Sequence, residues 1–326
     1  MLAIETRRLR KTYGAKVAVA DLTLSVGEGE VFGFLGPNGA GKSTVVKMLV
    51  GLVRPTSGDA RLLGRPLGDV DAKRRLGFLP EQFRFHEWLS ADEFLDFHGR
   101  LCGLKPSQRR RRIADTLELV GLTARASDQL RTFSKGMLQR IGIAQALMGD
   151  PDLVIFDEPT SALDPIGRRD VRDLIRHLKS LGKTVFLNSH LLSEVEMVCD
   201  RVAIIDRGRV VRQGMLADLL AERELELSVG NLTPELLGAL AVRWRVLSQN
   251  GSYLTLAISD DEDPPAVAAT VLAAGGRLYS MTPTRRSLED IFVQVVAREA
   301  DASRFAGGPT QAGGPASRSA TGEGSG

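Results

Sequence analysis

A glycine-rich stretch near the start of the chain has the residue types and spacing of a loop that binds phosphate. It reads Gly-Pro-Asn-Gly-Ala-Gly-Lys-Ser and fits the pattern GxxxxGKS. Glycines let consecutive backbone N–H groups turn towards one anion, the lysine can reach terminal phosphates, and the serine hydroxyl can ligate Mg²⁺. We expect a nucleotide to be held by Gly36, Pro37, Asn38, Gly39, Ala40, Gly41, Lys42, Ser43 and Thr44.

The residues on either side of this loop support the interpretation. Residues 31–35, Val-Phe-Gly-Phe-Leu, form a short apolar run that is typical of a buried parallel strand. Residues 43–50 have helical length and apolar spacing, and Gly51 follows where a helix would end. The loop is therefore expected to join a strand to the N-terminus of a helix, where the helix dipole favours an anion.

Two other apolar runs end in polar residues that could act on the same phosphates. Residues 153–156 lead to Asp157 and Glu158, and residues 184–187 lead through Asn-Ser to His190. Strand ends in an open parallel sheet border the ligand crevice, so we expect these side chains to meet the loop there. Asp157 would bind Mg²⁺, Glu158 would polarise an attacking water, and His190 would contact the γ-phosphate. Glu158, His190 and Lys42 are the predicted catalytic residues.

Two further segments have features suited to contact with a nucleotide. Tyr13 lies within an expected antiparallel β region, residues 2–26, and it is either a stacking partner for adenine or an ordinary strand-end residue. Ser134 and Gly136 open a helical stretch and offer N–H groups to an anion. Nothing within one chain explains a second anion site so far from the first in sequence.

The overall composition limits the class of protein. The 326 residues leave room for one large domain and one smaller domain, and 43% hydrophobic content is ample for a core. No apolar run approaches the length of a spanning helix, and the N-terminus shows no signal pattern. A net charge of +3 is too small to indicate nucleic-acid binding. The two cysteines lack metal-ligand spacing. We expect a cytoplasmic chain whose membrane role, if any, requires a partner.

The pattern along the chain predicts three regions. Residues 1–222 are expected to form an α/β domain with an antiparallel β subdomain and a helical subdomain over about 81–149. In the latter, Phe94, Leu95, Phe97 and Leu101 recur at helical spacing and are expected in the core. Residues 223–299 have the order βαββαβ, completed by a helix that Ser287 opens, and suggest a small ferredoxin-like α+β domain. Residues 300–326, rich in Gly, Ala, Ser and Pro, are expected to be disordered.

Taken in order, these motifs resemble the ATP-binding subunits of ABC transporters, a family of P-loop NTPases. The resemblance runs from Ile4 to about Glu222. It rests on a Walker A loop at 36–44, a Walker B strand and catalytic glutamate at 156–158, and a switch histidine at His190. It also includes a D-loop at Ser161–Asp164 and a signature at Ser134–Leu138 that resembles LSGGQ, with lysine in place of its first glycine. Tyr13 takes the place of the adenine-stacking aromatic, which favours that role.

The resemblance implies the cofactors and partners. ATP and Mg²⁺ would bind a head-to-tail dimer, formed by two copies or with a related ATPase chain. Ser134, Gly136 and Asp164 of one chain would then complete the site of the other. In the family's Q-loop, Glu81 takes the usual glutamine position and Gln82 is its neighbour, so the Mg²⁺ contact stays open between them. Ser43, Asp157 and Gln82 are the metal ligands predicted in this way.

The details of the motifs are similar to one branch of the family, whose members pair with six-helix membrane subunits and mostly export compounds. The expected function is therefore to energise transport, in the direction of export, through a separate integral membrane permease at the cytoplasmic face of the cell membrane. The alternative is a soluble ABC ATPase that acts on ribosomes or DNA. A nucleotide kinase is a weaker third hypothesis, because the signature and the switch histidine would then have no purpose.

Overall fold

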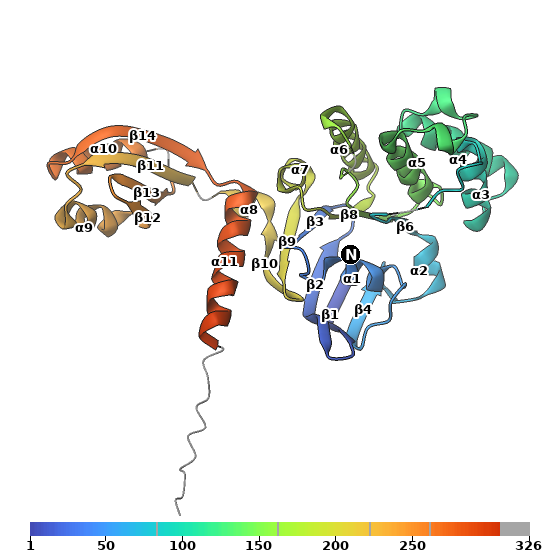
Figure 1. Cartoon of the computed structure of the whole chain (residues 1–326), viewed down its shortest axis with the longest axis horizontal. Coiled ribbons are helices and arrows are strands. Elements are labelled where there is room, and N and C mark those ends of the chain that lie inside the picture. Colours follow the sequence, from blue (N-terminus) through green and yellow to red (C-terminus); the bar gives the residue numbers. More distant parts are fainter. Residues whose placement is uncertain (83, 162, 222, 261, 307–326) are drawn as a thin grey trace, which may run out of the picture.

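The structure, a computed structural model, describes residues 1–82, 84–161, 163–221, 223–260 and 262–306. Within these ranges the chain forms a ten-stranded sheet and a four-stranded sheet, each with its own helices. Figure 1 shows the four-stranded sheet standing to one side of the larger unit. No helix in the described ranges has the length and apolar character needed to cross a membrane.

The large sheet joins a parallel half to a mostly antiparallel half, in which β10 and β2 are the parallel neighbours. Its strand order is β5-β4-β1-β2-β10-β9-β3-β8-β7-β6. The parallel half consists of β6 (Leu76–Leu79), β7 (Leu153–Asp157), β8 (Thr184–Asn188), β3 (Val31–Leu35) and β9 (Arg201–Asp206). The rest comprises β10 (Arg209–Met215), β2 (Lys16–Gly27), β1 (Leu2–Tyr13), β4 (Ser57–Leu62) and β5 (Arg65–Pro66). Every residue of β3, β7 and β8 is buried, which explains their continuous apolar sequences.

Helices cover the large sheet and form a separate cluster beside it. The sheet carries α1 (Lys42–Leu49), α2 (Val70–Arg74), α6 (Pro165–Ser180), α7 (Leu192–Val198) and α8 (Leu216–Leu220). The cluster contains α3 (Ala91–Leu101), α4 (Pro106–Leu119) and α5 (Lys135–Leu147), with 3₁₀ turns at Thr123–Arg125 and Leu130–Thr132. Figure 1 shows this cluster on the side opposite the four-stranded sheet. The predicted α/β core with antiparallel and helical parts is confirmed.

The predicted core stripe of α3 is only half right. Phe94 and Leu95 are buried as predicted, but Phe97 is 41% and Leu101 68% exposed. The prediction is wrong for these two residues because α4 and α5 cover only one side of α3, whereas helical spacing alone does not show how wide the covered face is. The ring of Phe97 instead meets the ring of His86 edge to face, with centroids 5.8 Å apart.

The four-stranded sheet has the order expected of a ferredoxin-like fold. The elements follow as β11 (Arg223–Gly230), α9 (Pro234–Arg243), β12 (Arg245–Asn250), β13 (Tyr253–Ile258), α10 (Asp263–Ala273) and β14 (Arg277–Arg285). Neighbouring strands are antiparallel in the order β12-β13-β11-β14. We call this part the C-terminal module. Its core is separate from the two clusters of the larger unit.

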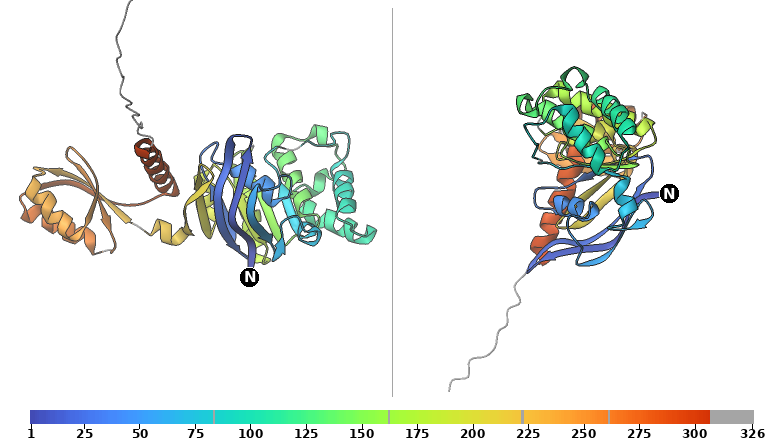
Figure 2. Two further views of the ribbon diagram at one scale, coloured as in Figure 1. Left: turned by 90° about the horizontal axis from the view of Figure 1, so that it is seen from below. Right: turned by 90° about the vertical axis from the view of Figure 1, so that its right-hand side faces the viewer.

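The last helix, α11 (Leu288–Ala306), packs in an unexpected place. The sequence predicts that it completes the C-terminal module, but the fully buried Leu288 and Ile291 belong to the core of the larger unit. Figures 1 and 2 show α11 beside that unit, where it contacts α7, α8 and β9. The module's own core is already formed with α9 and α10, so the apolar face of α11 is buried elsewhere.

The ends of the predicted regions are located only in part. The helix α11 extends to Ala306, past residue 300, where the sequence predicts that disorder begins. Residues 307–326 and the predicted domain boundary at Glu222 lie outside the described residues.

Candidate active site

The phosphate-loop motif lies between the end of β3 and the start of α1. Gly41 precedes α1 with φ of 105°, a backbone conformation that favours glycine. A Cβ atom on Gly41 would lie 2.4 Å from the carbonyl oxygen of Ala18, and one on Gly36 would lie 2.3 Å from that of Ile205. The loop is therefore pressed against neighbouring backbone, and its glycines are required by space as well as by conformation.

Lys42 is folded back across this loop. Its Nζ donates to the carbonyl oxygens of Gly36 at 2.6 Å and Pro37 at 3.3 Å, and the residue is only 8% exposed. Burial lowers the pKa of Lys42, while the negative charges of Glu158, Asp157 and Glu81 oppose that shift. The ammonium group is thus held where the loop's backbone and the two buried carboxylates converge.

Asp157 and Asn188 are paired at the ends of two neighbouring strands. They are register partners of β7 and β8, and Asn188 Nδ2 donates to Asp157 Oδ1 at 2.5 Å. Burial raises the pKa of Asp157, and the bond from Asn188 opposes this shift. Sequence reasoning missed Asn188 as a site residue, although its position at a strand end two residues before His190 was the available signal.

Glu158 and His190 form the second polar pair at this edge. Glu158 Oε2 lies 2.7 Å from His190 Nδ1, and the Glu158 N–H donates to the Asn188 carbonyl at 2.8 Å. Burial raises the pKa of Glu158, and the hydrogen bond with His190 opposes this shift. Glu158 has φ of 56°, an uncommon conformation for a residue other than glycine. The backbone of Glu158 is therefore strained, while its carboxylate is held by an imidazole and is suited to orient a water.

The adenine and Q-loop candidates lie nearer the surface. Tyr13 ends β1 with 48% of its surface exposed, and Lys11 Nζ lies 4.9 Å from the centre of its ring. Glu81 and Gln82 are exposed just after β6. The charge of Glu81 acts on both Lys42 and Asp157, which places it towards the phosphate loop.

The remaining predicted residues form a second group. Ser134 caps α5 by accepting from the Met137 N–H at 3.3 Å, and Asp164 caps α6 by accepting from the Gly167 N–H at 2.8 Å. A Cβ atom on Gly136 would lie 3.3 Å from Leu163 Cδ2, so the signature and the D-loop adjoin. Ala162 of the D-loop lies outside the described residues. Within the described part of the chain, no hydrogen bond or ion pair joins Ser134, Gly136 or Asp164 to residues 36–44.

Comparison with known proteins identifies two matching family models. Residues 19–161 match the model "ABC transporter", and residues 220–296 match the model "ATP-binding protein DrrA1-3-like, C-terminal domain". The second match spans the C-terminal module and the first part of α11.

Several known proteins are similar to this chain over most of their length. An uncharacterized ABC transporter ATP-binding protein of Synechocystis is 42% identical, over 89% of this chain and 84% of its own. The linearmycin resistance ATP-binding protein of Bacillus subtilis is 39% identical, over 90% of this chain and 98% of its own. The Nod factor export ATP-binding protein I of Cupriavidus pinatubonensis is 37% identical, over 91% of each chain.

A solved structure extends the similarity to the fold. It shows a dimeric ATP-binding cassette in a post-hydrolysis state with ADP and Pi. It is 28% identical, with a TM-score of 0.60, over 65% of this chain and 98% of its own. None of these comparisons supports a protein that acts on ribosomes or DNA.

Proposed function

Since the chain belongs to the family of ABC transporter ATP-binding proteins, we propose that it works as a dimer that hydrolyses ATP to drive export through a separate membrane permease. The observation that carries the hydrolytic part is the 2.7 Å contact between Glu158 and His190 at the strand edge that also holds Lys42. This arrangement combines a carboxylate base, an imidazole and an ammonium group around the phosphate loop.

The residues divide the chemistry of phosphoryl transfer among them. The backbone of residues 36–44 and the Lys42 ammonium bind the β- and γ-phosphates. Glu158 orients the attacking water and accepts its proton, while His190 holds that carboxylate and contacts the γ-phosphate. Tyr13 stacks on the adenine ring. The exposed position of Tyr13 and the buried position of Glu158 suit these two tasks.

The oxygen donors near the loop fit Mg²⁺. In proteins this ion takes one or two carboxylates together with phosphate oxygens and water. The described residues contain no cluster of three or more His, Cys, Asp or Glu side chains that could hold an ion alone, whereas Asp157 and the Ser43 hydroxyl supply a partial set. Glu81 or Gln82 would add a contact from the Q-loop. When bound, Mg²⁺ neutralises charge on the transferred phosphoryl group.

Dimerisation gives the second group of residues a purpose. Ser134 and Gly136 lie at the exposed start of α5, and Asp164 lies at the exposed start of α6. Because they make no bond to the loop of their own chain, we propose that they complete the nucleotide site of the partner chain. The solved relative with ADP and Pi is dimeric, which supports this arrangement.

Export and the membrane partner are inferred from the relatives. One relative is named for Nod factor export and another for linearmycin resistance. We propose that a permease binds the segment from Glu81 to Leu101, where Trp88 is 67% and Leu101 68% exposed, and that it holds the dimer at the cytoplasmic face of the membrane.

The Glu158→Gln variant tests this function. With ATP and Mg²⁺ it should form a stable dimer and co-purify from native membranes with an integral membrane protein, while its ATP turnover falls by about a thousandfold. Glu28→Gln, at an exposed turn, is the control and should hydrolyse ATP like the wild type. Full turnover by Glu158→Gln would contradict the assignment of the base. Recovery with ribosomes and without a membrane protein would contradict the transport function.

A further inference from the structure

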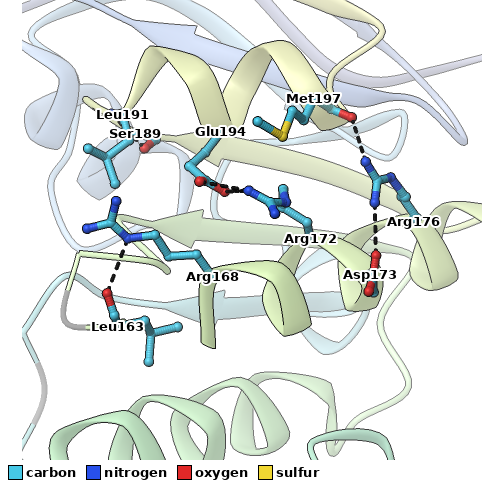
Figure 3. Close-up of polar contacts among 9 residues, drawn as sticks. All are labelled: Leu163, Arg168, Arg172, Asp173, Arg176, Ser189, Leu191, Glu194 and Met197. Carbon is cyan, nitrogen blue, oxygen red and sulfur yellow. Dashed lines mark hydrogen bonds and ion pairs between the residues drawn. The ribbon is translucent and has the colours of Figure 1, made fainter. Parts of the chain in front are cut away.

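Three arginines spaced four residues apart connect α6 to the elements around it. Arg168, Arg172 and Arg176 lie on one face of the helix, since residues four apart are neighbours on a helix surface. Figure 3 shows their side chains directed towards α7 and towards the loops at the start of both helices. Each arginine makes a different contact.

The middle arginine forms an ion pair with little exposure to water. Arg172 Nη1 lies 2.9 Å from each carboxylate oxygen of Glu194, and the two side chains are 18% and 10% exposed. If one partner moved away, the other charge would be left with little hydration, which is energetically costly. The two side chains are therefore held in one relative position. The pair therefore fixes the start of α7 against the middle of α6.

Glu194 is attached to the switch histidine by the start of α7. The N–H groups of Glu194 and Val195 donate to the Leu191 carbonyl, at 3.1 and 3.3 Å, and the Leu191 N–H donates to Ser189 Oγ at 3.1 Å. These bonds hold residues 189–195 as one unit, with His190 inside it. A shift of Glu194 would consequently move His190 relative to Glu158.

Arg172 is attached in a similar way to the D-loop. It lies on the helix that Asp164 caps, and Arg168 Nε of the same helix donates to the Leu163 carbonyl at 3.2 Å. The helix α6 thus carries the D-loop at its N-terminus and the partner of Glu194 two turns later.

We propose that Arg172 and Glu194 are positioning residues, which hold His190 against Glu158 and transmit movements of the D-loop to that pair. This inference rests on the proposed function, because it assigns a role to the pair within ATP hydrolysis. The D-loop, which leads directly into α6, would face the partner chain, so closure of the dimer would reach the base through α6 and this ion pair.

Arg176 offers a matched control. It also ties α6 to α7, through a bond of 3.2 Å to the Met197 carbonyl, and it pairs with Asp173 at 2.9 Å. Met197 lies in the last turn of α7 (Figure 3), whereas His190 precedes the first residue of this helix. If the arginines only attach one helix to the other, Arg172 and Arg176 should be equivalent in their effect on catalysis.

The first test compares kcat and KM for ATP in full-length variants. Arg172→Ala should lower kcat by about tenfold or more, because small displacements of catalytic groups are costly, and should leave KM within about twofold. The double variant Arg172→Ala with Glu194→Ala, which leaves no unpaired charge, should show the same split. Arg172→Lys should keep kcat within about threefold of the wild type, since a single nitrogen of Arg172 bonds both carboxylate oxygens of Glu194. Arg176→Ala should keep kcat within about twofold of the wild type.

The second test asks whether the effect passes through His190. In a His190→Ala background, Arg172→Ala should cause no further fall in kcat, because the group that it positions is already gone. An equal fall in both backgrounds, or an equal fall with Arg176→Ala, would overturn the inference.

A third measurement separates this inference from the proposed function. Hydrogen exchange of the Leu191–Val195 amides should be faster in Arg172→Ala than in the wild type and unchanged in Arg176→Ala. Unchanged exchange in Arg172→Ala would overturn the inference. If the wild type fails to hydrolyse ATP, the proposed function fails, while the exchange result still decides whether the pair holds this segment.

Discussion

Shortening Leu288 to alanine should loosen the larger unit, although Leu288 follows the C-terminal module in sequence. Leu288 is fully buried in the core cluster that includes Val195, Val198 and Cys199. Removing a buried leucine side chain costs about 2–5 kcal/mol, and a cost of about 3 kcal/mol corresponds to a change of about 100-fold in an opening equilibrium. The variant should open this cluster about 100-fold more often than the wild type.

The thiol of Cys199 provides the assay. It is buried in the same cluster, and burial raises its pKa, so it should react with a thiol reagent only when the cluster opens. The exposed Cys102 is replaced by serine, and labelling of Cys199 is timed with and without Leu288→Ala. Val293→Ala, on the same helix but 60% exposed, is the control and should change the rate by less than about threefold. Equal labelling rates in the two variants would refute the packing of α11 into the larger unit.

Three further perturbations test the site. Gly41→Ala should weaken binding of a fluorescent ATP analogue by more than about tenfold, because the new Cβ would lie 2.4 Å from the Ala18 carbonyl oxygen. Gly39→Ala, whose Cβ would meet nothing within 4 Å, should weaken binding less. The reverse order would be inconsistent with the loop geometry. Tyr13→Ala should raise the Kd for ATP by about 3–10-fold while Tyr13→Phe retains affinity, and equal losses would argue against stacking. Burial raises the pKa of Glu158 above 4.5, so the stability that its protonated form contributes is lost as pH rises through the raised pKa. Without nucleotide, Glu158→Gln should therefore unfold at a higher temperature than the wild type at about pH 8 and at an equal temperature at about pH 4. A lower unfolding temperature of Glu158→Gln at about pH 8 would contradict the direction of the pKa shift.

The elements around the phosphate loop could be predicted because their signals are local. A five-residue apolar run followed by GxxxxGKS fixes a strand, a loop and a helix within a few residues, and β3 and α1 occupy those positions. The βαββαβ order of the C-terminal module could be predicted equally well, because each of its strands and helices has its own local pattern. The Asn250-Gly251 turn also marks the boundary between β12 and β13.

Features that depend on distant partners could not be predicted in this way. The left-handed backbone of Glu158 goes together with a bond from its N–H to the carbonyl of Asn188, a residue at the end of β8 and 30 positions away in the sequence. The exposure of Leu101 depends on how far α4 and α5 cover α3. The destination of α11 depends on which apolar surface is left uncovered, and periodicity contains no information on that choice.

The short helix α7 shows how these distant contacts bear on the site. Glu194 pairs with Arg172 of α6, 22 residues away, and Glu196 Oε2 accepts from the Leu288 N–H of α11, 92 residues away, at 3.0 Å. Two residues apart on a helix differ by about 200° in direction, so α7 is held on nearly opposite sides. The contact with α6 lies in the first turn, next to His190, whereas the contact with α11 secures the body of the helix. Loss of Arg172 should therefore displace the histidine within a folded unit, and loss of Leu288 should open the unit around α7, which makes the two effects separable by kcat and by the labelling of Cys199.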